Sequence, residues 1–164
     1  ALVGLGFTAR SVERVAVWRS DLSLVRDSAE HYPDGKAAFY LKARRAATRG
    51  DAATAAAALS ALADRGFDGF LPFLQDPLWA PLHGRPDFDA ALARIAGNWL
   101  RQTKPRAALL QADLRARGLA HVTRGELAEA IREYEQAVAR GGPLDEVVRA
   151  ELEALRRRAA AGPR

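Results

Sequence analysis

Apolar and small residues along the chain recur three or four positions apart, which is the spacing of one face of an α-helix. The clearest example is segment 111–143, where Gly118 lies on a first helical run, Gly125 separates the runs, and Ala130 and Tyr134 lie on a second. Antiparallel helices cross closely only where side chains are nearly absent. The pattern therefore predicts a helical hairpin whose crossing lies at Gly118 and Ala130, with Tyr134 filling the flank.

A second segment, 36–69, repeats this arrangement. Its glycine turn at Gly50 stands 75 positions before Gly125, and Ala43 and Ala55 take the places of the small residues on either side. Apolar residues complete the face at Phe39, Ala46, Leu59 and Leu62. The stretch 52–58 is almost all alanine, which has the highest helix propensity. The sequence therefore predicts two equivalent hairpins.

The small residues and the glycine turn resemble the tetratricopeptide repeat, a 34-residue helical hairpin with small residues at its eighth, twentieth and twenty-seventh places. In segment 111–143 these places hold Gly118, Ala130 and Ala137. The resemblance implies an all-α, right-handed α-solenoid of about three and a half tetratricopeptide-like hairpins with a C-terminal capping helix. It also implies a bacterial protein-binding scaffold with an extended concave face.

On this interpretation residues 1–164 form a single repeat domain. Its expected units are a degenerate first unit (1–35), a repeat (36–69), an expanded degenerate repeat (70–110), a second clear repeat (111–143), and a capping helix with tail (144–164).

The expanded unit shows its own start signals. Asp76 followed by Pro77 predicts a capped short helix that reaches about Leu82, and Pro86 or Asp87 opens the next one.

Three further segments carry structural expectations. Segment 66–73 is too rich in glycine and proline to be helical throughout, and its phenylalanines are expected to plug the groove between hairpins. Residues 103–105 are expected to start a helix that continues over 107–124 and is longer than its counterparts. The last helix should run from about 145 to 160. Four of its residues are expected to face inward: Val147, Val148, Leu152 and Leu155.

Composition bears on two functions, nucleic-acid binding and cysteine chemistry. The chain has a net charge of +5 and a sequence pI near 10.2. Its basic residues are nearly all arginine, as codon bias in a GC-rich genome would produce, so the charge alone does not indicate nucleic-acid binding. Arg44, Arg45 and Arg49 are expected to spread around their helix and face solvent. The chain has no cysteine, which excludes disulfides and thiolate chemistry.

No pattern of catalytic residues is present. His31, His83 and His121 fall in different units, without a carboxylate or second histidine at ligand spacing, and no nucleophile elbow or phosphate-binding loop occurs. The sequence therefore predicts a non-enzymatic protein with no catalytic residue, no metal site and no cofactor.

Partner-binding residues follow from the resemblance. The concave face of the repeat family is lined by five places of each first helix, which here are Ala37, Tyr40, Arg44, Ala47 and Thr48, then Ala112, Arg115, Leu119, Val122 and Thr123. The predicted partner-binding set is Tyr40, Arg44, Thr48, Arg115, Leu119 and Val122. Arginine suits carboxylates, so the expected partner is an acidic protein or peptide with an apolar anchor. Two alternatives stay open: solvated arginines, and a face filled by the chain's own segment 70–73.

A different function is suggested by the start of the chain. Residues 1–7 are apolar, and Arg14, Trp18 and Arg19 follow, as at the end of a membrane helix. The apolar start followed by residues 17–21 resembles the junction where tetratricopeptide repeats follow the last membrane helix of bacterial glycosyltransferase-like proteins. The chain would then be a soluble accessory domain tethered to the inner membrane and facing the periplasm, with the catalytic part elsewhere. Otherwise the segment is an amphipathic first helix, and the sequence does not fix the compartment.

Overall fold

The computed structural model describes residues 21–102 and 109–161. In this part of the chain every regular element is helical, which confirms the predicted all-α class. The described residues form eight α-helices and one 3₁₀-helix: α2 (Asp21–His31), α3 (Lys36–Thr48), α4 (Ala52–Asp64), α5 (Leu71–Gln75), η1 (Pro77–Leu82), α6 (Pro86–Gln102), α7 (Gln111–Thr123), α8 (Leu127–Arg140) and α9 (Asp145–Ala160).

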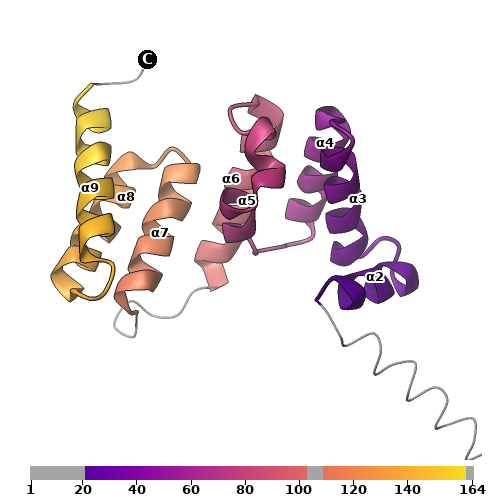
Figure 1. The fold of residues 1–164 in the computed structure, drawn as a ribbon, viewed down its shortest axis with the longest axis horizontal. Helices are drawn as coiled ribbons and strands as arrows, with labels where there is room; N and C mark the ends of the chain where they lie inside the picture. Colours follow the sequence, from indigo (N-terminus) through magenta and orange to yellow (C-terminus); the bar gives the residue numbers. More distant parts are fainter. Residues whose placement is uncertain (1–20, 103–108, 162–164) are drawn as a thin grey trace, which may run out of the picture.

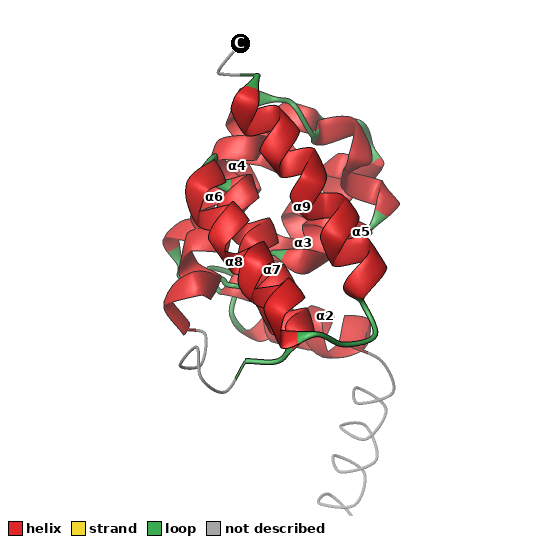
Figure 2. Cartoon of the chain, turned by 90° about the vertical axis from the view of Figure 1, so that its left-hand side faces the viewer, coloured by secondary structure: helices red, strands yellow, loops and turns green. Residues whose placement is uncertain are grey.

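The helices follow one another across the molecule in chain order (Figure 1). Helix α2 packs on α3, α3 on α4, α4 on α6, α6 on α7, α7 on α8, and α8 on α9. Each helix thus packs against elements close to it in sequence. Viewed end-on, the helices lie behind one another in a stack (Figure 2).

Short polar signals set several helix starts. The Asp51 carboxylate accepts a hydrogen bond from Thr54 N at 3.0 Å, and Asp76 accepts one from Leu78 N at 3.0 Å. These bonds satisfy backbone donors that the first helical turn leaves without partners. The predicted cap at Asp76 is therefore confirmed, although the element that it starts, η1, is a 3₁₀-helix with Pro81 inside it.

The two predicted glycine turns have the same backbone geometry. Gly50 has a φ of 74° and Gly125 a φ of 76°, a left-handed conformation that glycine adopts at little cost. Each turn also has the same hydrogen bonds: Asp51 N donates to Ala46 O, as Glu126 N does to His121 O, both at 2.9 Å. The turns of hairpins α3–α4 and α7–α8 therefore have the same conformation and the same hydrogen bond.

The predicted crossing of α7 and α8 is also present. Gly118 is buried, Ala130 is fully buried, and the ring of Tyr134 lies directly on Gly118. A Cβ added at Gly118 would lie 2.5 Å from Tyr134 Cδ2 and closer still to Cε2. Only glycine fits beneath this ring.

The buried side chains form two separate clusters. The N-terminal cluster joins α3 to α6 and includes Leu59, Phe73 and Trp79, whereas the C-terminal cluster joins α7 to α9 around Tyr134 and Val148. Helix α7 contributes to both, because Ala120 belongs to the first cluster and Leu114 to the second.

Two expectations about helices are wrong. Helix α7 begins at Gln111 and not at the predicted start, residues 103–105, because Leu110 is extended and its N–H donates to the Asp113 carboxylate at 2.9 Å. Residues 103–108 lie outside the described part. Val147 is exposed on α9, whereas Val148, Leu152 and Leu155 are buried as predicted.

Residues 21–102 and 109–161 contain no helix that is both long and apolar enough to cross a membrane. The predicted membrane junction lies outside the described residues except for Asp21, the first residue of α2, and stays a prediction.

Candidate functional site

The predicted binding residues on α3 are engaged within the molecule. The Arg44 guanidinium lies 2.6 Å from the Asp76 carboxylate and 5.8 Å from the ring centroid of Tyr40. The hydrogen bond to Asp76 raises the pKa of Arg44, and bonds from Leu78 N and Arg44 lower the pKa of Asp76. The carboxylate that a partner was expected to offer to Arg44 is therefore supplied by Asp76 of the chain itself.

Aromatic residues from segment 66–82 cover Tyr40. Its ring centroid lies 6.1 Å from those of Phe67 and Phe73, and Phe73 in turn packs on Trp79. Phe70 and Phe73 are fully buried. These contacts confirm that the phenylalanines of this segment fill a groove between hairpins. For Tyr40, the alternative that the chain's own segment 70–73 fills the predicted binding face is therefore correct, because Phe73 packs on its ring.

The predicted residues on α7 are also engaged. Arg115 forms a two-pronged pair with Glu151 of α9, with Nε and Nη2 at 2.8 and 2.6 Å from the two carboxylate oxygens, and this pairing raises the Arg115 pKa. Leu119 packs against the N-terminal cluster and Val122 against the C-terminal one. The structure therefore does not bring Arg115 into a common open site with Arg44.

An open pocket of about 370 Å³ lies between α2 and α3 and includes two of the predicted residues. It is lined by Arg26 of α2 and by Leu41, Arg44, Arg45, Thr48 and Arg49 of α3. Sequence reasoning expected Arg44, Arg45 and Arg49 to face solvent, and Arg45 and Arg49 are indeed exposed. It did not foresee the pocket, which forms because α2 packs on α3 and adds a fourth arginine beside the other three.

The pocket carries uncompensated positive charge. Within the described part of the chain, Arg26 and Arg45 have no carboxylate partner, whereas Arg44 is paired with Asp76 and Arg49 is close enough to Asp51 to help lower the pKa of that carboxylate. Leu41 is half-buried and supplies an apolar surface together with the aliphatic stems of the arginines. The spacing of Arg45 and Arg49, four residues apart on one helix face, was the signal available in the sequence.

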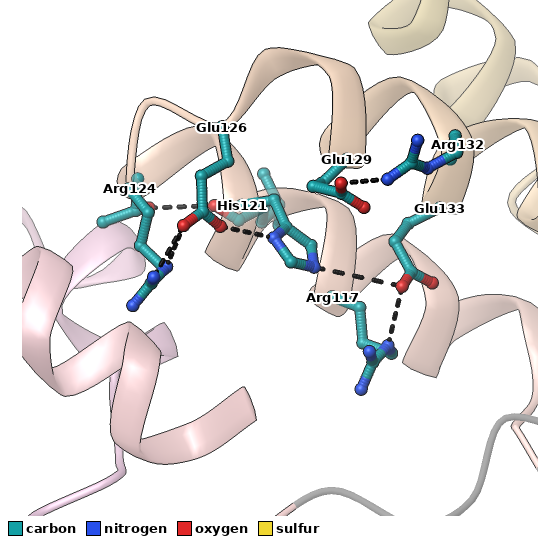
Figure 3. Close-up of polar contacts among 9 residues, drawn as sticks. Arg117, His121, Arg124, Glu126, Glu129, Arg132 and Glu133 are labelled. Carbon is teal, nitrogen blue, oxygen red and sulfur yellow. Dashed lines mark hydrogen bonds and ion pairs between the residues drawn. The ribbon is translucent and has the colours of Figure 1, made fainter. Parts of the chain in front are cut away.

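A second polar group lies within hairpin α7–α8 (Figure 3). His121 Nδ1 lies 2.7 Å from Glu126, and its Nε2 lies 3.9 Å from the fully buried carboxylate of Glu133. Arg117 Nε donates to Glu133 at 3.0 Å, and Arg124 donates to Glu126 at 2.8 and 2.6 Å. Sequence spacing did not reveal these two carboxylates beside His121.

This network joins the two helices. Pairing with Arg124, then with His121, lowers the Glu126 pKa to about 2. The ring of His121 is mostly buried, and the network contains no hydroxyl or thiol that could act as a nucleophile. By holding Glu126 with His121 and Arg124, the network stabilises the turn at Gly125.

In residues 21–102 and 109–161, no group of three or more histidine, cysteine or acidic side chains is placed to hold a metal ion. Comparisons of the chain with protein-family models, with curated proteins and with solved structures found no match.

Proposed function

We propose that the chain is a tetratricopeptide-like helical-repeat scaffold without catalytic activity, and that it binds an acidic protein segment with an apolar anchor. The binding site is the arginine pocket between α2 and α3. The observation that carries the proposal is the convergence of four arginines and Leu41 on one open pocket, two of the arginines, Arg26 and Arg45, having no carboxylate partner in the described part of the chain.

The equivalence of the two clear hairpins supports the repeat assignment. Residues 75 positions apart play the same part in each: Ala43 and Gly118, Ala55 and Ala130, Leu59 and Tyr134, Leu62 and Ala137 are all buried. Repeats stack because one hairpin cannot bury its apolar face alone. A right-handed solenoid with a C-terminal cap is the architecture that we infer.

The chemistry of the pocket supports an acidic ligand with one apolar residue. Each guanidinium presents a fixed fork of donors that matches a carboxylate, and Leu41 offers contact to an apolar side chain. Exposed ion pairs contribute about 0.2–1 kcal/mol each, so the expected affinity is about micromolar.

Synthetic peptides test this proposal. Fluorescence anisotropy would compare labelled peptides that carry one leucine among several glutamates with versions in which glutamine replaces glutamate or serine replaces leucine. We expect the parent peptide to bind most tightly. The double variant Arg45→Glu/Arg49→Glu should weaken binding by about tenfold, because two attractive contacts become repulsive.

The matched control is Arg140→Glu/Arg158→Glu, which makes the same charge change at two exposed residues outside the pocket. It should leave peptide binding nearly unchanged. Equal weakening by both double variants would refute the pocket as the site. Tighter binding of a single-stranded oligonucleotide than of any acidic peptide, abolished by Arg45→Glu/Arg49→Glu, would replace the protein ligand with a nucleic acid.

A further inference from the structure

A second pocket lies on a different part of the molecule, between α4, α6 and α7. Its volume is about 370 Å³, and it is lined by Ala63, Asp64, Gly66, Arg94, Asn98, Arg101 and Arg124. None of these residues belongs to the pocket between α2 and α3, so a ligand bound at this second pocket is independent of the proposed function.

Three guanidinium groups meet at this pocket, and carboxylates compensate two of them. Arg94 pairs with Asp64 at 2.6 Å, and Arg124 pairs with Glu126 at 2.6 Å. Arg101 donates to the amide oxygen of Asn98, and the described residues provide no carboxylate for it. The pocket therefore has one more positive charge than its own acidic groups neutralise.

The pocket holds two of these cations close together at one point of α6. A Cβ added at Gly97 would lie 3.8 Å from Arg101 Nη1 and less than 3.0 Å from Arg124 Nη1, so both nitrogens lie close to the same point of α6. Like charges gathered at one point repel unless an anion lies beside them. The missing side chain of Gly97 makes room for the Arg124 guanidinium, although glycine within a helix lowers its stability.

The pocket also has fixed polar walls. Asn98 is buried, and its amide nitrogen donates to Ala63 O and Phe67 O at 2.9 Å each, which orients its oxygen toward Arg101. Lys36 Nζ donates to Gly66 O at 3.0 Å and adds a further cation at the edge. Asn98 is thereby held in one orientation by the backbone of the α4 end and the following loop.

We propose that this pocket binds a phosphate group, held by Arg101 and Arg124 with Arg94 at its side. Planar guanidinium forks match phosphate oxygens in pairs, and a phosphate group supplies the negative charge that the pocket lacks. Because the pocket is larger than one phosphate ion, there is room for part of the molecule that carries the group.

Inorganic phosphate and pyrophosphate are the probes for the test. The melting temperature of residues 1–164 would be followed as each anion is added, with sodium chloride at equal ionic strength as the reference and citrate as the carboxylate alternative. We expect a saturable rise with both phosphates, because a ligand that binds only the folded state stabilises it.

Two substitutions locate the site. Arg101→Gln removes the uncompensated charge, and Gly97→Ala displaces Arg124. Each should raise the apparent Kd about tenfold or more, since a hydrogen bond to a charged group is lost. Arg140→Gln, which removes an exposed arginine elsewhere, is the control and should bind phosphate as the unsubstituted protein does.

Three outcomes would overturn the proposal. The first is a phosphate effect no larger than that of sodium chloride. The second is an equal effect in the unsubstituted protein and in Arg101→Gln. The third is saturable binding of citrate without binding of phosphate, which would make the pocket a carboxylate site. Failure of phosphate binding leaves the acidic-peptide test unaffected, because Arg45→Glu/Arg49→Glu does not alter this pocket.

Discussion

The contact between Gly118 and Tyr134 gives the sharpest test of the packing. Gly118→Ala would place a Cβ 2.5 Å from Tyr134 Cδ2, and the ring is 1% exposed, so it has little room to move. Overpacking of this kind costs about 1–3 kcal/mol. Alanine returns about 1 kcal/mol through higher helix propensity. We therefore expect a net loss of up to about 2 kcal/mol in the free energy of unfolding.

Gly97→Ala is the matched control, because Gly97 is also a buried glycine inside a helix. Its added Cβ would also lie closer than 3.0 Å to a neighbour, but that neighbour is the end of the flexible Arg124 side chain. The guanidinium can move away, so the gain in helix propensity should leave stability unchanged or slightly higher. The same substitution is thus expected to have opposite effects at the two glycines.

Urea denaturation followed by circular dichroism would measure both variants. A loss of about 1 kcal/mol corresponds to a fall in melting temperature of about 2–4 °C for a chain of this size. In a double-mutant cycle, Gly118→Ala should cost less when Tyr134 is replaced by leucine, because the ring that it meets is gone. A Gly118→Ala variant at least as stable as the unsubstituted protein would refute the crossing geometry.

Three further measurements test other elements. Ala130→Leu should lower the free energy of unfolding by about 1–3 kcal/mol, because Ala130 is fully buried at the crossing; a change below about 0.5 kcal/mol would contradict this. Glu126→Gln should cost about 1 kcal/mol at pH 7, since the folded state lowers the Glu126 pKa from 4.5 to about 2 and solvent screens part of the effect. That difference should shrink as pH falls from 4.5 toward 2, and a constant gap would exclude the ion pair as its cause. Backbone amides of Pro77–Leu82 should exchange faster than those of 52–62, because a 3₁₀-helix with an internal proline has weaker hydrogen bonding; equal protection in the two segments would contradict this.

Local signals predicted most of the helical elements. The Asp76–Pro77 start and the glycine turns at Gly50 and Gly125 depend on backbone chemistry within a few residues, which the sequence displays directly. The start of α7 was misplaced because alanines and leucines continue the helical pattern before residue 111. The bond from Leu110 N to Asp113 decides the boundary.

The candidate sites could be predicted only in part. Arg44 and Thr48 were identified, but the pairing of Arg44 with Asp76 joins segments 32 residues apart, and no periodicity fixes how the irregular segment 66–82 lies on α3. Arg26 was missed for the same reason, since its place in the pocket depends on how α2 packs. The polar network around His121 was also missed. The sequence did offer one signal, because the equivalent place in hairpin α3–α4 holds the small buried residue Ala46, whereas hairpin α7–α8 has a histidine there.

The separation of the buried side chains into two clusters has a consequence for how the chain would respond to force. Helix α7 is the element that contributes to both clusters, and the guanidinium of Arg124 lies at the boundary beside Gly97. Because the described helices pack mainly on their neighbours in sequence, the two clusters can lose their packing at different forces. Stretched from its ends in an optical trap, the molecule should extend in two steps, with α7 to α9 and α3 to α6 releasing their lengths separately.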